Sequence, residues 1–379
     1  MILFADENIP ECERYFADLG ELRRGPGRSL AAADLGDVDV LLVRSVTRVD
    51  RALLEGSGVR FVGSCTAGID HIDRAYLDAA GIAFAHAPGA NARSVVEYVW
   101  AALGHLVSAR GLDLDHAVVG VVGLGHIGLR LYRLLRTLGL ACVAFDPLLA
   151  GGPREGRLAS LDALLAQADV ITLHTPLSRG GPFPTWHMLD AARLAALRPD
   201  ATLINTSRGA VIDNRALAQA LSSRPDLTAV LDVWEREPEI APELLGRVAL
   251  ATPHIAGYSY DGKVQGTRMV GSALRRWLAL PPLAAAECGG GVEQRDRRSG
   301  PGEWRALLAA MPGIYDIAAD DRRMRVALQQ ATDRVQAFER LRRDYPVRRE
   351  ASFYRSDSGA PHALAATLDA IEGPESAAR

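Results

Sequence analysis

The sequence lacks the features that mark membrane, secreted or nucleic-acid-binding proteins. It has four cysteines that lie far apart, so neither a disulfide framework nor a zinc site is expected. The formal net charge is −3, which provides no positive field to attract nucleic acid. No apolar run approaches the roughly 20 residues that cross a bilayer. We therefore expect a cytoplasmic protein with reduced cysteines, no metal, and neither a nucleic acid nor a membrane as its partner.

Short apolar runs alternate with amphipathic stretches along most of the chain. This rhythm predicts parallel strands that are connected by helices. A single core stops growing at roughly 250–300 residues, so we expect two doubly wound α/β domains. Strands are expected at residues 2–5, 38–43, 60–63 and 81–84 of the first, and at residues 117–122, 140–145, 169–173, 201–205 and 228–231 of the second.

The composition changes after the second set of strands. A long helical pattern at residues 91–109 precedes those strands, and another at residues 260–279 follows them. Pro281, Pro282 and the glycines at residues 289–291 then introduce a polar segment rich in arginine, which is typical of a linker. Beyond it we expect a small C-terminal α+β domain, with a helical pattern at residues 320–343 and a flexible tail.

A glycine-rich turn lies between an apolar strand and an amphipathic helix. In such a G-x-G-x-x-G turn the glycines allow a tight turn, a close approach to a pyrophosphate and close helix packing. The first N–H groups of the helix can then bind the anion. Asp146 ends the next strand, where its carboxylate would bind a ribose and repel a 2′-phosphate, so NAD is favoured over NADP. The turn consists of Gly123, Leu124, Gly125, His126, Ile127 and Gly128.

Three side chains that follow apolar strands of the second domain could carry out a dehydrogenation. His254 could take the hydroxyl proton of a 2-hydroxy acid that loses a hydride from C2. The carboxylate of Glu237 would orient that ring, and Arg208 could bind a substrate carboxylate with two hydrogen bonds. Each also has a plain structural interpretation, as a turn-capping histidine, a surface charge and a solvated residue at a strand end.

The order of these elements resembles the D-2-hydroxyacid dehydrogenase family over roughly residues 35–280, because Arg-Gly, Glu-Pro and Pro-His-x-x-Gly segments follow the glycine-rich turn. The resemblance implies a Rossmann NAD-binding domain, residues 99–256, inserted in a substrate-binding domain, residues 1–98 and 257–282. It implies a C-terminal dimerisation domain, residues 283–379, in a homodimer. It makes Arg208, Glu237 and His254 the catalytic residues. Further cofactor contacts would be Thr175, Thr206, Ser207, Asp232 and Gly257.

Several segments resemble one branch of that family, which oxidises 4-phospho-D-erythronate to 3-hydroxy-2-oxo-4-phosphobutanoate with NAD in vitamin B6 biosynthesis. They are residues 5–10, 44–47, 64–71, 88–98 and 254–259. This resemblance implies that Ser45, Thr66 and Tyr258 bind a phosphorylated 2-hydroxy acid.

The basic residues that would bind the phosphate are left open among Arg44, Arg93 and Lys263, the last being the one lysine of the sequence. Two other functions also stay open. One is a related dehydrogenase that acts on 3-phosphoglycerate or hydroxypyruvate. The other is an NAD-sensing corepressor that binds peptides.

Overall fold

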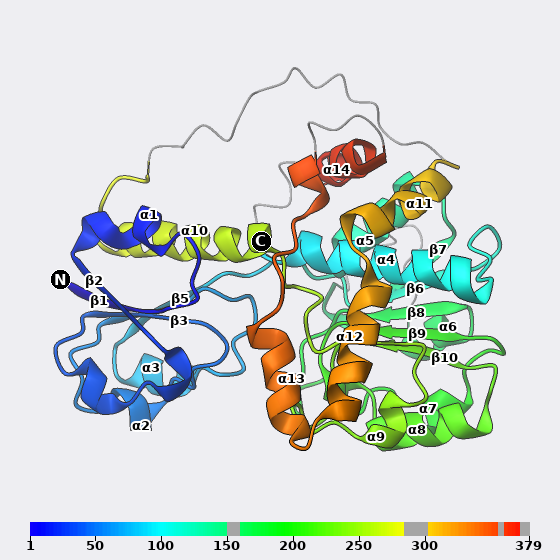
Figure 1. Cartoon of the computed structure of the whole chain (residues 1–379), viewed down its shortest axis with the longest axis horizontal. Helices are drawn as coiled ribbons and strands as arrows, with labels where there is room; N and C mark the ends of the chain where they lie inside the picture. Colours follow the sequence, from blue (N-terminus) through cyan, green and yellow to red (C-terminus); the bar gives the residue numbers. More distant parts are fainter. Residues whose placement is uncertain (150–159, 284–301, 355–359, 372–379) are drawn as a thin grey trace. The chain divides into compact units, whose positions relative to one another are not determined.

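The computed structural model describes residues 1–149, 160–283, 302–354 and 360–371 (Figure 1). The chain divides into two compact units, Met1–Asn91 with Tyr258–Arg295, and Ala92–Gly257 with Asp296–Arg379. Each unit contains one parallel sheet, which confirms the expected pair of doubly wound domains. The assignment of substrate binding, NAD binding and dimerisation to particular segments stays a prediction.

The first unit is built on a five-stranded sheet in the order β2-β1-β3-β4-β5. Alternate residues of β3 face opposite sides, so that Val40 and Leu42 lie in one core and Leu41 and Val43 in the other. Helices α1 (Cys12–Phe16) and α10 (Tyr260–Trp277) cover one face, and α2 (Arg51–Leu54) and α3 (Arg74–Ala79) the other (Figure 1). The strands are β1 (Ile2–Asp6), β2 (Glu21–Gly25), β3 (Val40–Val43), β4 (Phe61–Ser64) and β5 (Ala83–His86).

The second unit has a six-stranded sheet in the order β11-β10-β9-β8-β6-β7. Helices α4 (Ala92–Arg110) and α5 (Gly128–Thr137) contribute to the core on one face. The core on the other face includes residues of α6 (Leu161–Leu165), α7 (Ala191–Ala195), α8 (Asn214–Ser223) and α9 (Pro242–Leu245). The strands are β6 (Val119–Val122), β7 (Cys142–Phe145), β8 (Val170–Leu173), β9 (Thr202–Asn205), β10 (Thr228–Leu231) and β11 (Leu250–Ala251).

The C-terminal region is helical where the structure describes it, so the expected α+β character is corrected. Within residues 302–354 and 360–371 no strand is present. The reason is the spacing of apolar residues, because Trp304, Leu307, Leu308 and Met311 bury one side of a helix. The elements are α11 (Trp304–Ile314), α12 (Ile317–Gln330), α13 (Arg334–Arg343), a 3₁₀ turn at Ala351–Tyr354 and α14 (Ala360–Ile371).

These helices belong to the second unit rather than to a separate compact unit. Trp304 and Leu307 share a core with Val95 and Leu103 of α4. The pattern expected to run as one helix over residues 320–343 breaks before Asp333, whose side chain caps α13 by accepting the N–H of Gln336 at 2.9 Å. Most of the linker that we expected at residues 283–302 lies outside the described residues. Of the tail that we expected to be flexible, residues 360–371 form α14, in which Leu364, Ala365 and Leu368 are buried.

Two expectations about composition can be compared with the structure. Cys12, Cys65 and Cys142 are buried and unpaired, as expected for packing residues, whereas Cys288 lies outside the described residues. In the described part of the chain, no helix combines the length and the apolar character needed to cross a bilayer.

Candidate active site

The three candidate catalytic residues follow three neighbouring strands of the second unit. Arg208 comes after β9, Glu237 after β10 and His254 after β11, and these strands are adjacent in the order β11-β10-β9. Parallel strands present their carboxyl ends at the same edge of a sheet, which is where ligands bind in open α/β folds. Topology therefore brings the three loops to one edge of the sheet.

His254 and Glu237 form a hydrogen-bonded pair. The Nδ1 atom of His254 lies 2.7 Å from Oε2 of Glu237. The other carboxylate oxygen accepts the backbone N–H of Trp234 at 2.7 Å, so the carboxylate is fixed by its own loop. The side chains of His254 and Glu237 are 34% and 16% exposed. With Nδ1 held by Glu237, Nε2 is the ring nitrogen that can exchange a proton with a substrate.

The electrostatics of this pair favour an ionised carboxylate. Burial alone would raise the pKa of Glu237. The charge and hydrogen bond of His254 and the N–H of Trp234 lower it by more than burial raises it, so the pKa lies below its ordinary value. At neutral pH the carboxylate can therefore orient the imidazole and stabilise its protonated form.

Asp232 holds the backbone that carries His254. The carboxylate, 1% exposed, accepts the N–H groups of Ile255 and Ala256 at 2.8 and 2.9 Å and the hydroxyl of Thr252 at 2.6 Å. His254 itself has a φ of 59°, a left-handed conformation that side chains other than glycine adopt only when their surroundings hold them. Although we expected Asp232 beside the cofactor, its described contacts are with the histidine loop.

The residue after Arg208, Gly209, must be a glycine because two loops meet there. A Cβ atom at Gly209 would lie 1.9 Å from the carbonyl carbon of Trp234, so only glycine lets the loop after β9 approach the loop that carries Glu237. The Nη1 group of Arg208 donates to the carbonyl of Ser207 at 2.8 Å. Ser207 is held in turn by the side chain of Asn205, which accepts both its N–H and its hydroxyl.

The glycine-rich turn has the shape that a dinucleotide requires. Gly123 has a φ of 87°, and a Cβ there would lie 2.8 Å from the carbonyl oxygen of His174. A Cβ at Gly128, the first residue of α5, would lie 1.8 Å from the carbonyl oxygen of Gly123. At Gly125, by contrast, a Cβ would meet nothing within 4 Å. Gly125 thus leaves open the space in front of the helix N-terminus, where a pyrophosphate can bind.

The loops beside this turn also fit a dinucleotide. Thr175 has a buried hydroxyl with no hydrogen-bond partner in the described part of the chain, which leaves it available to a cofactor. Asp146 accepts the N–H groups of Leu124 and Leu148 at 2.8 and 3.0 Å, one on each oxygen. Each carboxylate oxygen can accept a further bond, so the role expected for Asp146 toward a ribose remains compatible with its contacts.

A buried histidine lies next to Thr175. His174 has ring nitrogens 2.9 Å from the hydroxyl of Thr172 and 3.3 Å from that of Thr206. Burial lowers its pKa to about 3, so the ring is neutral at physiological pH. His174 therefore orients the hydroxyl of Thr206, a predicted cofactor contact, without adding a charge.

The predicted substrate contacts lie in the first unit. Ser45 follows β3 and Thr66 follows β4, and these two strands are neighbours. The hydroxyl of Thr66 lies 2.9 Å from that of Ser64, which in turn lies 3.0 Å from Nε2 of His71. The ring of Tyr258, the third predicted contact, lies 4.7 Å from the ammonium group of Lys263.

The three candidate phosphate ligands have different partners. Arg44 donates from Nε to Oδ1 of Asp6 at 2.9 Å, and Asp6 is 1% exposed. Arg93, in the second unit, forms an ion pair with Asp369 at 2.5 Å. Lys263 lies over the ring of Tyr258.

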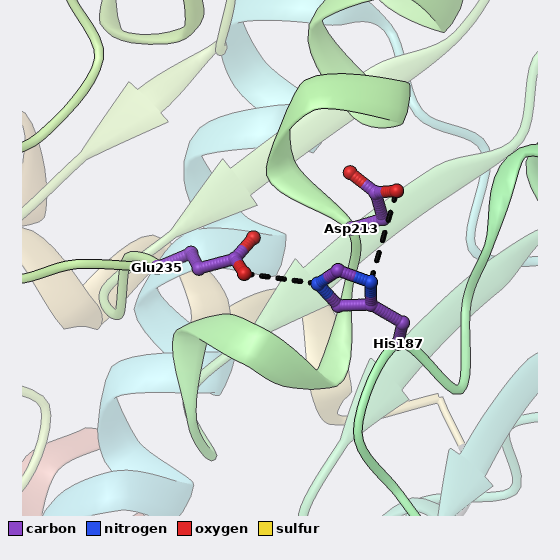
Figure 2. Close-up of side chains that lie close together, drawn as sticks. All are labelled: His187, Asp213 and Glu235. Atoms are coloured by element: carbon purple, nitrogen blue, oxygen red, sulfur yellow. Dashed lines mark hydrogen bonds and ion pairs between the residues drawn. The ribbon is translucent and has the colours of Figure 1, made fainter.

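The sequence analysis did not anticipate a cluster of His187, Asp213 and Glu235 (Figure 2). Of the described residues, this is the one group of three potential metal ligands. Its geometry favours a hydrogen-bonded bridge, because Nε2 of the ring lies 2.9 Å from Glu235 and Nδ1 lies 3.8 Å from Asp213. Asp213 also caps α8 by accepting the N–H groups of Arg215 and Ala216. The cluster thus connects the start of α8 to the loop that carries Glu237.

Comparisons with known proteins agree with this geometry. Residues 85–256 match the family model of the D-isomer specific 2-hydroxyacid dehydrogenase NAD binding domain, and residues 293–371 match a domain of unknown function. Erythronate-4-phosphate dehydrogenase of Pseudomonas entomophila is 50% identical over 357 residues, 92% of each chain. That of Pseudomonas aeruginosa PAO1 is 46% identical over 386 residues, 98% of this chain and 99% of the relative. The chain belongs to the erythronate-4-phosphate dehydrogenase family.

Solved structures show the same fold as this member of the erythronate-4-phosphate dehydrogenase family. The TT0316 protein from Thermus thermophilus has a TM-score of 0.65 at 26% identity and covers 75% of this chain and 99% of its own. D-Lactate dehydrogenase from Aquifex aeolicus, complexed with NAD and lactic acid, has a TM-score of 0.62 at 24% identity and covers 74% and 96%. The matched NAD binding domain makes NAD the cofactor and the protein a dehydrogenase.

Proposed function

We propose that this chain oxidises 4-phospho-D-erythronate at C2 to 3-hydroxy-2-oxo-4-phosphobutanoate with NAD, a step of vitamin B6 biosynthesis. The observation that carries the proposal is the contact of 2.7 Å between His254 and Glu237 at the carboxyl edge of the NAD-binding sheet. The choice of substrate is supported by relatives that are 46–50% identical and named for it.

In the proposed reaction the C2–H and O–H bonds of the alcohol break and a carbonyl forms. Bound NAD supplies the acceptor for the hydride. His254 takes the hydroxyl proton on Nε2, and Glu237 stabilises the resulting imidazolium. Arg208 binds the substrate carboxylate, which holds C2 and its hydroxyl in place for the transfer. The cofactor is held by the glycine-rich turn, Asp146 and Thr175.

For the substrate we propose contacts from the first unit. Ser45, Thr66 and Tyr258 bind the phosphorylated acid, and Arg44 and Lys263 are the stronger candidates for its phosphate. The bond from Arg44 to Asp6 uses one of five N–H donors and fixes the guanidinium. Arg93 is the weakest candidate because it belongs to the second unit, whereas the other proposed substrate contacts belong to the first.

We further propose that the protein acts in the cytoplasm as a homodimer, with residues 283–379 as the dimerisation domain. Mass measurement by light scattering on the full chain tests the homodimer. A monomeric mass would contradict it.

The decisive test of the proposed reaction is NADH formation with 4-phospho-D-erythronate, compared with 3-phosphoglycerate and with hydroxypyruvate reduction by NADH. We expect kcat/KM to be highest for 4-phospho-D-erythronate. A higher value for one of the other acids would reassign the substrate. A protein that turns over none of these acids but binds a peptide in an NAD-dependent manner would be a corepressor instead.

A further inference from the structure

An arginine from the C-terminal region reaches the loop that carries His254. Arg348 follows α13 and is 6% exposed. Its Nη2 group donates to the carbonyl of Ala256 at 2.7 Å and to that of Ser94 at 3.1 Å, and it also bonds the hydroxyl of Ser94. The Nη1 group lies 3.5 Å from the carbonyl of Ile255. Arg348 thus contacts the two residues that follow the histidine.

The same two residues are held from their other side by Asp232. Its carboxylate accepts the N–H groups of Ile255 and Ala256, while Arg348 binds their carbonyls. The N–H groups and the carbonyls of Ile255 and Ala256 are therefore all bound by buried charged side chains. Such a clamp suits a residue in a left-handed conformation, which its neighbours must impose.

The guanidinium of Arg348 packs on an aromatic ring that is itself held by hydrogen bonds. It lies 4.3 Å from the ring centroid of Tyr315. Tyr315 and Tyr345 both donate to Asp320, at 3.0 and 2.6 Å. Because the ring of Tyr315 packs on the planar guanidinium, its two terminal nitrogens meet the carbonyls in a defined geometry.

Buried carboxyl groups stand near the same arginine. Glu97 of α4 is 1% exposed and accepts the N–H of Ala351 at 3.0 Å. Glu350, two residues after Arg348, is 7% exposed. The C-terminal region is thus joined to α4 by the bonds of Arg348 to Ser94 and of Ala351 to Glu97, and to the histidine loop by the bonds of Arg348. It belongs to a segment whose matching family has no assigned function.

We propose that Arg348 is a positioning residue for His254, so that the C-terminal region sets the direction of the catalytic imidazole. The inference rests on the proposed role of His254 as the base. A displacement of reacting groups by about 1 Å can reduce turnover by roughly 100-fold. Loss of the clamp should therefore slow catalysis without removing a group that touches the substrate.

The test compares Arg348→Met with a matched control, Arg325→Met. Arg325 also joins the C-terminal helices to the rest of the unit, by donating to the carbonyls of Leu245 and Val248 at 2.7 and 2.9 Å. We expect Arg348→Met to lower kcat by roughly 10- to 100-fold, with NADH affinity within about 3-fold of the original. Arg325→Met should lower the melting temperature similarly and leave kcat nearly unchanged.

A double-variant cycle separates positioning from general stability. In a His254→Ala background Arg348→Met should cause little further loss of kcat, because the group that it positions is gone. Losses that multiply, or equal kcat values in the two arginine variants, would overturn the inference. If Arg348→Met does not fold, Arg348→Lys replaces it, since lysine keeps the charge but cannot bind two carbonyls with a planar fork.

The outcomes for substrate and for Arg348 are distinguishable. If the unchanged protein prefers another 2-hydroxy acid, the same variants are compared on that acid, and only the proposed substrate fails. A protein without any dehydrogenase activity would contradict both.

Discussion

The carboxyl edges of the two parallel sheets differ in the chemistry that they present. In the first unit the predicted contacts are hydroxyls and fixed cations, such as Ser45, Thr66 and the pair of Arg44 with Asp6. In the second unit they are a glycine-rich turn and an ionised carboxylate bonded to an imidazole, Glu237 with His254. With the roles proposed above, the same architecture supplies binding groups in one case and reactive groups in the other, so function would lie in the loops rather than in the fold.

The largest expected effect concerns the carboxyl edge of the second unit's sheet, where His254 lies. His254→Ala should lower kcat by about 10²–10⁴, the range for loss of a positioned general base. Binding of NADH, followed by its fluorescence, serves as the control and should change little. Turnover at the original rate would show that the edge of the second sheet does not carry the chemistry.

Arg208→Met should have the next largest effect. Hydrogen bonds to charged groups contribute about 1.5–3 kcal/mol, so kcat/KM should fall by roughly 10- to 100-fold. Because the guanidinium would bind the carboxylate in both ground and transition states, KM should rise as kcat falls. A change in kcat alone, at constant KM, would contradict the role of a carboxylate ligand.

Substitutions in the first unit, where the proposed substrate contacts lie, should change KM for the phosphorylated substrate. Lys263→Ala and Arg44→Met should each raise KM for 4-phospho-D-erythronate by roughly 10-fold, the value of one lost charge-assisted bond. Neither should alter KM for unphosphorylated erythronate, which is the matched control. Equal changes with both substrates would exclude a contact with the phosphate.

The smallest effect concerns stability. Burial, together with the charge of Glu350, raises the pKa of Glu97 to about 8, against the opposing N–H of Ala351 and the charges of Arg348 and Arg93. The folded protein therefore retains a proton that the unfolded chain releases near pH 4.5. The contribution of Glu97 to the free energy of unfolding is fully present below that pH, and it is lost as the pH rises toward 8.

Glu97→Gln measures this contribution, because glutamine imitates the protonated acid. The melting temperature of the variant relative to the unchanged protein should rise between pH 5 and pH 9, because the variant lacks the group whose titration destabilises the folded protein over that range. A constant difference across that range would contradict a protonated Glu97.

Much of the fold was predictable because its signals are local. Apolar runs located nine strands, and the strand, turn and helix around Gly123 indicated the cofactor site. Strand β2 was missed because Glu21–Gly25 is polar and lies at the sheet edge, with no buried residue. The C-terminal region was assigned incorrectly because its helices interrupt one another with short turns, which blur the helical period.

The network around Glu237 and His254, the proposed catalytic pair, was predictable only in part. Glu237 and His254 follow strands in a recognisable order. The contacts of Asp232, Tyr98 and Arg348 instead join segments that are distant in the sequence, such as Tyr98 with Thr252 at 2.6 Å. No local pattern signals such contacts. Their one sequence signal is a polar residue inside an apolar stretch, as Glu97 is within α4.

The most direct test of the account is the pH dependence of kcat/KM with 4-phospho-D-erythronate, measured in the unchanged protein and in Glu237→Gln. If Glu237 stabilises the protonated imidazole of His254, the acidic limb of the profile should move toward lower pH in the variant, and the maximal rate should fall. An acidic limb at the same pH in both proteins would contradict the proposed pair.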